Sequence, residues 1–586
     1  MAAPSPVQLA TTLPSFAITL NGSAIDSSIQ VVSIEVWSDV NKLPHARLVM
    51  SDGSVADESF PISEGSSFIP GVPIVIALGY GSSLTTVFSG VIYRHGLQAT
   101  VNGPSRLVVE ATDKAMAMTL SRQNAVYQNT TDSAVWSQLV AAANLSASVT
   151  STSVQYESIV QYYASNWDFL VMRAQLNSMV VTVNAGTVTV APPNTSGTAV
   201  LSLAFGDSIL DMSLEMDAST QLPSNAIQSV AWDPGSQALV KSSSAEASVS
   251  TPGNISSATL AQVFGVNAYV QQSIGALAQD QLTGWSSAEL MISQLSKIRG
   301  QVRFQGSALA APGSMVTLAG LGERFNGDAY VSGVHHRFAE GLWQTTVKLG
   351  LPREWFAATA PRVAAPGASG LMPPVNNVQI GTVKQIDQDP AGEFRVLVTL
   401  PLLQTQGDLG VWARFGSFYA SKGIGSNFYP EIGDEVVLAF LDGDPRYPVV
   451  LGSLYSKVNP PPYTPAAANN IKSFMTKSKL HIDFIEDNPE ILITTPANQS
   501  VDINDKTGAI TITDKNGNSI TLDSNGITLK SASDITLQAS GSIKMTAGAN
   551  VEISASAAFT AQAQSSAKIT ATGTVQVSGA MVQLNP

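Results

Sequence analysis

The final sixty residues repeat an apolar pattern every eight residues, and this period limits the possible folds more than any other feature. Two apolar columns run through the repeat, two residues apart. The first column contains Ile527, Ile535, Ile543, Val551, Phe559, Ala567 and Val575. The second contains Leu529, Leu537, Met545, Ile553, Ala561, Ile569 and Val577. Because strand side chains alternate between faces, each octad presents two apolar side chains on one side.

Eight residues are too few for one complete coil of a single-chain solenoid. At about 3.3 Å per residue the perimeter is roughly 26 Å, a circle roughly 8 Å across, which leaves no room for inward side chains. We therefore interpret each octad as one strand and a kink, forming one side of a prism. Three chains give the smallest closed prism, with the columns, apart from Ala561 and Ala567, as its core. The alternative, a disordered Ser/Thr/Ala tail, does not explain an apolar register kept over seven repeats.

The composition also favours a chain that is covered by copies of itself. Charged residues make up 12% of the 586 residues, and between Ile535 and Pro586 the only ones are Lys544, Glu552 and Lys568. Interface cores are depleted in charge, so we expect an obligate oligomer. The net charge of -13 argues against nucleic-acid binding, which depends on neutralising phosphates. The absence of cysteine excludes disulfides, thiolate metal sites and a cysteine nucleophile.

The N-terminus has no basic segment followed by an apolar run, and no uninterrupted apolar window approaches the length of a membrane span. We therefore expect synthesis in the cytoplasm without a signal peptide, and no transmembrane helix.

Alternating apolar residues in the first 350 residues indicate a mainly β region with helices inserted. Strands are predicted at 16–25, 31–37, 74–78, 179–183 and 187–190. Helices are predicted at 131–143, 166–176 and 286–298, and a loop is predicted at 242–256. Thr131 or Asp132 is the predicted N-cap of the first helix.

An internal repeat in this region predicts two related β-barrels. Residues 70–78 lead to 88–94, and residues 312–319 lead to 330–337 at nearly the same interval. In this alignment Gly71 pairs with Gly313 and Gly90 with Gly333, at offsets of 242 and 243 residues. The alternative is a pair of generic β-hairpins that share turn residues, because Pro-Gly before a strand is common.

A third region, between two Pro/Ala-rich linkers at 358–374 and 459–469, predicts a small barrel. Its five short strands are predicted at 380–386, 394–400, 411–415, 435–440 and 447–451. Five strands separated by Asp, Gly and Pro turns are typical of an OB fold.

The acidic residues of the third region do not form a recognisable calcium loop. They lack the 12-residue frame of alternating oxygen ligands that ends in Glu. We interpret them as carboxylates that cap turns containing Gly433 and Gly443. These acidic residues are Glu431, Asp434, Glu435, Asp442 and Asp444.

No residue pattern predicts a metal, a cofactor or a catalytic site. His335 and His336 are neighbours on a predicted strand, so their rings point to opposite faces and are not expected to share a metal. The last histidine is His481, which argues against a His-x-His iron site near the C-terminus. The chain has no Gly-x-Ser-x-Gly elbow, Walker loop or His-Glu-x-x-His helix. We therefore predict that the protein is not an enzyme.

The third region carries a long sequence motif. Its segments are Gly381-Thr-Val, Asp389-Pro390, 395–401, 411–416, 430–440 and 442–452. Its motif residues are Trp412, Arg414, Pro430, Gly433, Asp434, Glu435, Asp444, Pro445, Pro448 and Gly452. These segments resemble the base domain of phage baseplate spikes and of the VgrG proteins of type VI secretion and extracellular contractile injection systems. Asn166-Trp-Asp-Phe-Leu170 is similar to a helix signature in the hub part of that family.

The resemblance implies a fused hub and spike with a defined order of domains. We expect a fold of two hub β-barrels with helical insertions, an OB barrel and a C-terminal intertwined triple-stranded β-helix. The expected domains are hub barrel 1 (1–120), a helix-containing hub insertion with strands (121–240), hub barrel 2 (241–357), a linker (358–375), the OB domain (376–456), a second linker (457–475) and the spike (476–586). Some relatives carry a lysozyme or toxin domain, for which we expect no room here.

The resemblance also implies a function and a set of partners. Two barrels in each of three chains would match a hexameric inner tube, and the spike would pierce the target membrane transiently. Expected partners are two further copies of this chain, the tube protein, baseplate wedge proteins, a separate PAAR-like tip protein and effector cargo. We expect the chain to be part of a phage tail-like particle that acts at, or is released toward, a target cell surface. The alternative is a trimeric tail protein for host-surface recognition or glycan hydrolysis, which needs aromatics and paired carboxylates in a groove.

Overall fold

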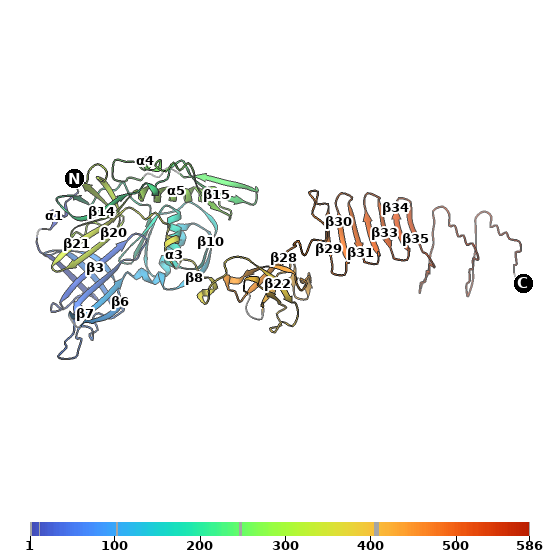
Figure 1. Ribbon diagram of the computed structural model, residues 1–586, viewed down its shortest axis with the longest axis horizontal. Coiled ribbons are helices and arrows are strands. Elements are labelled where there is room, and N and C mark those ends of the chain that lie inside the picture. The colour runs from blue at the N-terminus through green and yellow to red at the C-terminus, as the bar shows by residue number, and fades with distance from the viewer. Residues whose placement is uncertain are drawn as a thin grey trace. The chain divides into compact units, whose positions relative to one another are not determined.

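The computed structural model describes residues 3–10, 12–100, 103–244, 249–361, 363–403 and 409–584 (Figure 1). The chain divides into two compact units. The first contains residues 1–378 and 439–448, and the second contains residues 379–438 and 449–586. Each unit is described by itself below. Among the described residues, no helix is long and apolar enough to span a membrane.

A 13-stranded sheet forms the framework of the first unit, in the order β14-β18-β21-β20-β3-β4-β7-β6-β5-β1-β2, with β19 and β13 branching from β20. Its strands in the first third of the chain are β1 (Pro14–Leu20), β2 (Ser23–Ala24), β3 (Val31–Asp39), β4 (His45–Ser51), β5 (Pro73–Tyr80), β6 (Ser83–Thr100) and β7 (Gly103–Thr112). The later strands are β13 (Leu201–Ala204), β14 (Ile209–Met216), β18 (Ile298–Gln305), β19 (Met315–Ala319), β20 (Gly327–Ala339) and β21 (Leu342–Leu349).

Two separate apolar cores lie against this sheet, one in each half, in the region where the sequence predicts two related β-barrels. The first core contains Ile34, Ile76 and Leu107, and the second contains Phe304 and Val331. The antiparallel pairing of β3 with β20 joins the two halves of the first unit into one continuous sheet. This pairing connects residues about 300 positions apart, so no local pattern could have indicated it.

The predicted alignment of the two repeats is wrong at its second glycine. Gly71 and Gly313 occupy equivalent turns, since each has a positive φ and donates its N–H to the carbonyl of the partner strand. From this anchor, however, the strand register places Gly90 opposite Ile74, whereas the equivalent Val316 lies opposite Ala329 rather than Gly333. β19 is shorter than β5, so the second arm of this repeat is reached sooner along the chain although the loop before β20 is longer than the β5–β6 turn.

The small sheets and most of the helices lie between β7 and β18 along the chain, whereas α1 precedes β1 and α6 follows β21. The helices are α1 (Pro6–Leu9), α2 (Asp132–Ala142), α3 (Asn166–Leu176), α4 (Ser257–Ala261), α5 (Gln279–Leu295) and α6 (Phe356–Thr359). The strands of the small sheets are β8 (Arg122–Thr130), β9 (Ser146–Val149), β10 (Tyr156–Ser165), β11 (Val180–Asn184), β12 (Thr187–Ala191), β15 (Ile227–Asp233), β16 (Ala238–Ser243) and β17 (Tyr269–Ser273).

The predictions of α2 and α3 are confirmed, including the cap of α2. Thr131 is its N-cap, and the Thr131 hydroxyl accepts the N–H of Ala134. The third predicted helix is wrong at both ends. The observed α5 begins at Gln279, seven residues before the predicted start, and ends before Ile298, which opens β18. The first turn of α5 is polar, and the Gln281 side chain accepts the N–H of Ala278. Because the N-cap residue is Ala278 and not Ser, Thr, Asp or Asn, the sequence does not mark the start of this helix.

His336, which lies inside the first unit, makes the stability of this unit depend on pH. Its Nδ1 is 2.9 Å from the Thr345 hydroxyl, and burial, with the neighbouring His335, lowers the pKa of His336 to about 3. The unfolded chain therefore binds a proton at His336 near pH 6.5, while the folded chain remains neutral there. The free energy of unfolding is consequently expected to fall as the pH decreases from about 6.5 toward 3, by up to about 1.4 kcal/mol for each pH unit at this residue.

The variant His336→Gln tests this expectation by urea unfolding at pH 7 and pH 4.5. Because Gln does not titrate, the variant should lose less stability than the wild type over this interval. An equal loss in both proteins would show that other groups cause the acid sensitivity.

A closed five-stranded barrel opens the second unit, in the order β22-β23-β24-β28-β27. Its strands are β22 (Gln379–Gln385), β23 (Val396–Thr399), β24 (Val411–Phe415), β27 (Glu435–Phe440) and β28 (Pro448–Ser453). All five predicted strands are thus present. A two-strand hairpin that was not predicted, β25 (Ala420–Ser421) with β26 (Ile424–Gly425), lies between β24 and β27. In this region the prediction succeeded because each strand is an apolar run between turn residues.

A seven-stranded antiparallel meander follows the barrel (Figure 1). Its strands are β29 (Ile471–Met475), β30 (His481–Ile485), β31 (Glu490–Thr494), β32 (Ser500–Asn504), β33 (Ala509–Thr513), β34 (Ser519–Asp523) and β35 (Gly526–Lys530). Each strand has five residues and pairs with the next strand along the chain. Residues 531–584 continue the chain beyond this sheet and contain no assigned strand.

Candidate assembly surface

The meander β29–β35 has one apolar face, and the register aligns its side chains in two columns. The first column contains Phe474, Ile482, Ile493, Val501, Ile512, Ile520 and Leu529. The second contains Phe484, Ile491, Ile503, Ile510, Leu522 and Ile527. Directly paired β-branched and aromatic side chains stabilise a sheet, but here one side of each remains open.

This apolar face is exposed although it lies in the middle of a sheet. Ile503 is 39% exposed and Ile510 is 40% exposed, values that are unusual for paired isoleucines within regular strands. The opposite face is more polar, since one row across it contains Asp483, Leu492, Asp502, Thr511 and Thr521. A continuous exposed apolar face of this length is typical of a surface that another chain covers.

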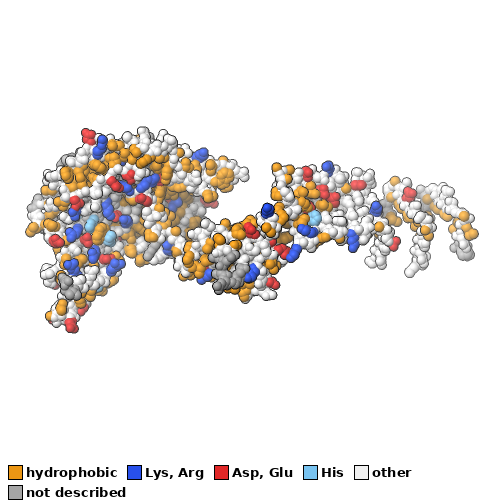
Figure 2. All heavy atoms as spheres, viewed as in Figure 1, with side chains coloured by type: hydrophobic (Ala, Val, Ile, Leu, Met, Phe, Trp, Pro, Cys, Tyr) orange, Lys and Arg blue, Asp and Glu red, His pale blue; other side chains and the backbone are white. Residues whose placement is uncertain are grey.

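The two octad columns continue the two columns of the meander. Ile527 and Leu529, the first members of the octads, lie on β35 opposite Leu522 and Ile520. Beyond β35 the apolar octad side chains are also exposed, from 51% at Val575 to 83% at Ile569. Few charged side chains lie along this arm (Figure 2). The predicted core residues Ile535, Leu537, Met545, Val551, Ile553, Phe559, Val575 and Val577 are exposed in the same way.

The N-terminal half of this surface, from Phe474 to Leu522, was not predicted from the sequence. The missed signal is a pair of apolar residues two positions apart, as in Ile482 and Phe484, that recurs at intervals of nine or ten residues. Hairpin turns of varying length cause this irregular interval. A search for a strict period of eight therefore begins only at Ile527.

A hydrogen-bond cluster supports the polar face of the meander at its N-terminal end. The Asp483 carboxylate is 4% exposed and accepts hydrogen bonds from the hydroxyls of Tyr463 and Ser473, at 2.7 and 2.6 Å. His481 Nδ1 lies 2.9 Å from the same carboxylate. The hydrogen bond to Asp483, with burial, raises the pKa of Tyr463 to about 12. This cluster attaches the segment before β29 to the sheet.

The predicted motif residues of the barrel lie on its strands and turns. Trp412 and Arg414 are on β24, Glu435 begins β27, and Pro448 and Gly452 are on β28. Of the remaining residues, Pro430, Gly433 and Asp434 lie before β27, and Asp444 and Pro445 lie before β28.

Three carboxylates near these barrel turns accept backbone hydrogen bonds. Asp434 accepts the N–H of Glu431 at 2.9 Å, and Asp442 accepts the N–H of Ser369 at 3.0 Å. Asp444 accepts the N–H and the guanidinium of Arg446, and the hydrogen bonds from Arg446 lower the pKa of Asp444. Among the described residues, no group of three or more His, Asp or Glu side chains has the geometry to hold a metal ion.

The two adjacent histidines of β20 have different surroundings. His336 is buried, whereas the His335 ring stacks on Trp37 with centroids 4.7 Å apart. His45 stacks on the indole as well, at 4.6 Å. Burial lowers the pKa of both His45 and His335, which favours neutral rings. The three rings thus pack β3, β4 and β20 against one another.

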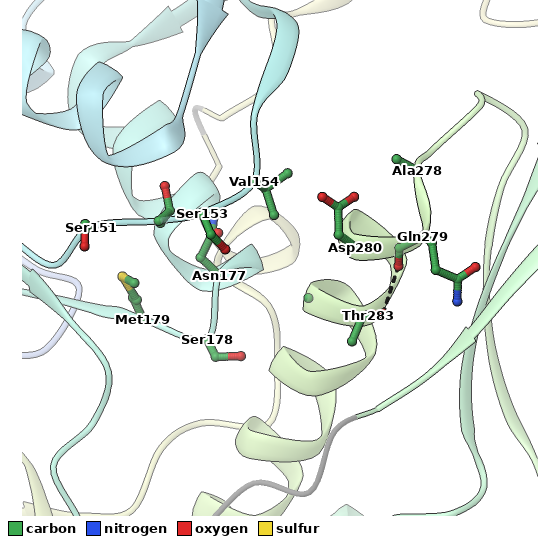
Figure 3. A pocket seen from close by; sticks show the side chains of 12 residues that line it. Ser151, Ser153, Val154, Asn177, Ser178, Met179, Ala278, Gln279, Asp280 and Thr283 are labelled. Carbon is green, nitrogen blue, oxygen red and sulfur yellow. Dashed lines mark hydrogen bonds between the residues drawn. The ribbon is translucent and has the colours of Figure 1, made fainter.

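A cleft of about 810 Å³ lies in the first unit, beside the start of α5 (Figure 3). Residues 151–154 and 177–179 line one side of it, and residues 278–280 with Thr283 line the other. The Thr283 hydroxyl donates a hydrogen bond to the carbonyl of Gln279 at 2.8 Å. Asp280 is the one carboxylate among the lining residues, so this cleft lacks the carboxylate pair that glycoside hydrolysis requires.

Three protein-family models match the chain. An "Alg8 N-terminal domain" model matches residues 10–340, more than half of the chain. The closed barrel matches the "Type VI secretion system/phage-baseplate injector OB domain" at residues 379–455. The meander from β31 onward and the first octads match the "Phage baseplate V C-terminal trimerisation domain" at residues 490–558. The protein belongs to the VgrG and phage baseplate V spike family and carries an Alg8 N-terminal domain.

Curated relatives of the spike protein include two VgrG proteins of Pseudomonas aeruginosa. VgrG1b is 28% identical over 36% of the present chain and 31% of its own length. VgrG5 is 32% identical over 17% of the present chain and 14% of its own length. Both are described as type VI secretion system spike proteins. The matched regions thus span about a third or less of these relatives.

Two solved structures are similar to large parts of the spike protein. The 43 kDa tail protein of prophage MuSo2 from Shewanella oneidensis aligns over 58% of the present chain and 99% of its own, with a TM-score of 0.44 and 10% identity. The E. coli c3393 protein, described as a component of the type VI secretion system, aligns over 75% of the present chain and 99% of its own, with a TM-score of 0.37 and 15% identity.

Proposed function

We propose that the protein is a non-enzymatic homotrimer that forms the central hub and membrane-piercing spike of a contractile injection system. The observation that carries this proposal is the pair of apolar columns that runs without interruption from the meander into the octads. In a single chain these columns are open to water. Three copies would bury them on a shared axis and pair the octads of different chains, and closure would remove exposed strand edges. The match to a trimerisation domain over residues 490–558 supports this assembly.

Low charge suits the spike to a passage through a bilayer. Each charged side chain at the centre of a membrane costs about 2.5 to 3.5 kcal/mol or more. Between Ile535 and Pro586 each chain contributes only Lys544, Glu552 and Lys568. The interlocked backbone of a closed prism supplies the stiffness that a piercing element requires.

The hub would match the threefold spike to a sixfold tube. The first unit contains two β halves with separate cores, so a trimer presents six such halves. We propose a hexameric inner tube protein and baseplate wedge proteins as neighbours of the hub, a PAAR-like protein at the tip, and effector proteins as cargo. The particle would be assembled in the cytoplasm and released toward a target cell surface.

Native mass spectrometry and particle imaging of the full-length protein test this proposal. The expected result is one species with the mass of three chains and an extended C-terminal shaft. A monomer, or a C-terminal arm that coils on itself, would contradict it.

A glycan hydrolase is the second candidate, and one observation makes it worth testing. A hollow of about 280 Å³ beside β30 and β31 is lined by Glu486, Glu490 and Asp505 together with Phe484. Glu490 accepts hydrogen bonds from the amides of Asn488 and Asn504, at 3.0 Å each. The non-enzymatic proposal predicts that the purified protein releases no product when it is incubated with peptidoglycan and capsular glycans. Turnover that Glu490→Gln abolishes would replace the non-enzymatic proposal.

A further inference from the structure

An aromatic cluster connects the barrel with the first strand of the meander. The rings of Phe418 and Phe428 stack with centroids 6.3 Å apart, and the ring of Phe428 stacks on that of Phe474 at 6.1 Å. We call these three residues the aromatic clasp. Phe418 is 79% exposed, and the other two are more than half exposed. All three lie in the second unit.

The segment that carries Phe418 and Phe428 is internally braced. Residues 416–430 leave the barrel after β24, form the β25–β26 hairpin and return toward β27. The hydroxyls of Ser417 and Ser426 are 2.6 Å apart, and Ser426 donates its N–H to the carbonyl of Tyr419 at 2.8 Å. A segment held in this way presents its aromatic rings in a fixed position, which reduces the conformational entropy lost on binding.

The composition of this segment is that of an interface core. Of residues 416–430 only Lys422 is charged, while the exposed side chains include Tyr419 and Ile424. Interface cores are depleted in charge and enriched in aromatic residues. An exposed aromatic patch rimmed by polar residues marks a contact surface rather than ordinary solvent-facing side chains.

The clasp is continuous with the apolar face of the meander. Phe474 pairs directly with Ile482 and is the first member of one apolar column. Lys477, in the turn after β29, forms an ion pair with Glu431 at 3.1 Å, so the barrel and the meander also touch beside the rings. The later members of this column, from Ile493 onward, lie in the region that matches a trimerisation domain, and the strand register carries the same apolar face back to Phe474.

We propose that the aromatic clasp packs against a second copy of this chain, so that the trimer interface extends from the spike onto the OB barrel. The proposal rests on the proposed trimer and adds an occupant for this barrel surface. The neighbouring copy reaches Phe418 from the side of the shared axis, near the base of the meander. The clasp would thereby fix the barrels to one another where the shaft begins.

Photo-crosslinking of the full-length protein tests the clasp. The variant Phe418→p-benzoylphenylalanine keeps an aromatic ring at this position, and irradiation followed by a denaturing gel separates cross-linked dimers from single chains. The same probe at Leu402, which is 87% exposed on the barrel region, is the control. The clasp predicts about tenfold more covalent dimer from position 418 than from position 402.

The outcomes separate the clasp from the trimer itself. A protein with the mass of a trimer that gives equal dimer yields from both positions would overturn the clasp and leave the proposed spike intact. A protein with the mass of one chain would contradict the proposed spike. As a second measurement, Phe418→Ser combined with Phe428→Ser should reduce the trimer fraction about threefold at the urea concentration that dissociates half of the wild type. Phe394→Ser combined with Leu402→Ser, at two other exposed sites, should leave this fraction unchanged.

Discussion

Replacing Ile543 by Asp is expected to prevent the protein from forming a trimer. Ile543 is the third member of the first octad column, and its side chain is 55% exposed in the single chain. In the proposed prism, three copies of this side chain meet on the axis. Three carboxylates would then lie close together without counterions, and each buried charge costs several kcal/mol. Size-exclusion chromatography with light scattering should therefore show single chains where the wild type shows trimers.

The variant Thr536→Asp is the matched control for this experiment. Thr536 lies between Ile535 and Leu537, so its side chain points away from the apolar columns. The substitution Thr536→Asp introduces the same charge one octad earlier, on the outer face, where water solvates the carboxylate. This variant should remain trimeric. A trimeric Ile543→Asp protein with a folded spike would mean that the octads do not face a common axis.

The OB barrel and two helices could be predicted from the sequence because their signals are local. Each barrel strand is an apolar run between turn residues, and α2 begins at a Thr N-cap whose hydroxyl accepts a backbone N–H. The start of α5 gave no such signal, because its first turn is polar and is capped by a Gln side chain. Local patterns identify elements, and they fail where a cap or a turn uses an uncommon residue.

The pairing of distant strands could not be predicted in this way. β3 and β20 join the two halves of the framework sheet. Trp37 on β3 and His335 on β20 are about 300 residues apart, so their contact depends on the whole fold. The assembly surface is an intermediate case. Its octads were visible as a strict period, whereas the columns through Ile503 and Ile510 became visible only through the strand register. The aromatic clasp likewise requires contacts that no spacing in the sequence indicates.

The second large effect is expected from Asp132→Ala, in the helical part of the first unit. Asp132 is fully buried, and its carboxylate accepts two hydrogen bonds from the guanidinium of Arg173, at 2.6 and 2.8 Å. The side-chain amide of Asn177 donates a third, at 2.8 Å. Removal of the carboxylate leaves the largely buried Arg173 cation without its partner, which typically costs about 3 to 5 kcal/mol. Hydrogen exchange of the amides in α2 and α3 should accelerate accordingly.

Two further variants show whether the unpaired charge causes this loss. Asp211→Ala breaks the exposed ion pair with Arg303, so it should cost no more than about 1 kcal/mol. Asp132→Ala combined with Arg173→Met should be more stable than Asp132→Ala alone, because the second substitution removes the unpaired cation and keeps an apolar chain against Tyr156. If Asp132→Ala costs as little as Asp211→Ala, the pair contributes little to the stability of the first unit. A large loss that Arg173→Met relieves would instead identify the pair as the connection that holds α2 against α3.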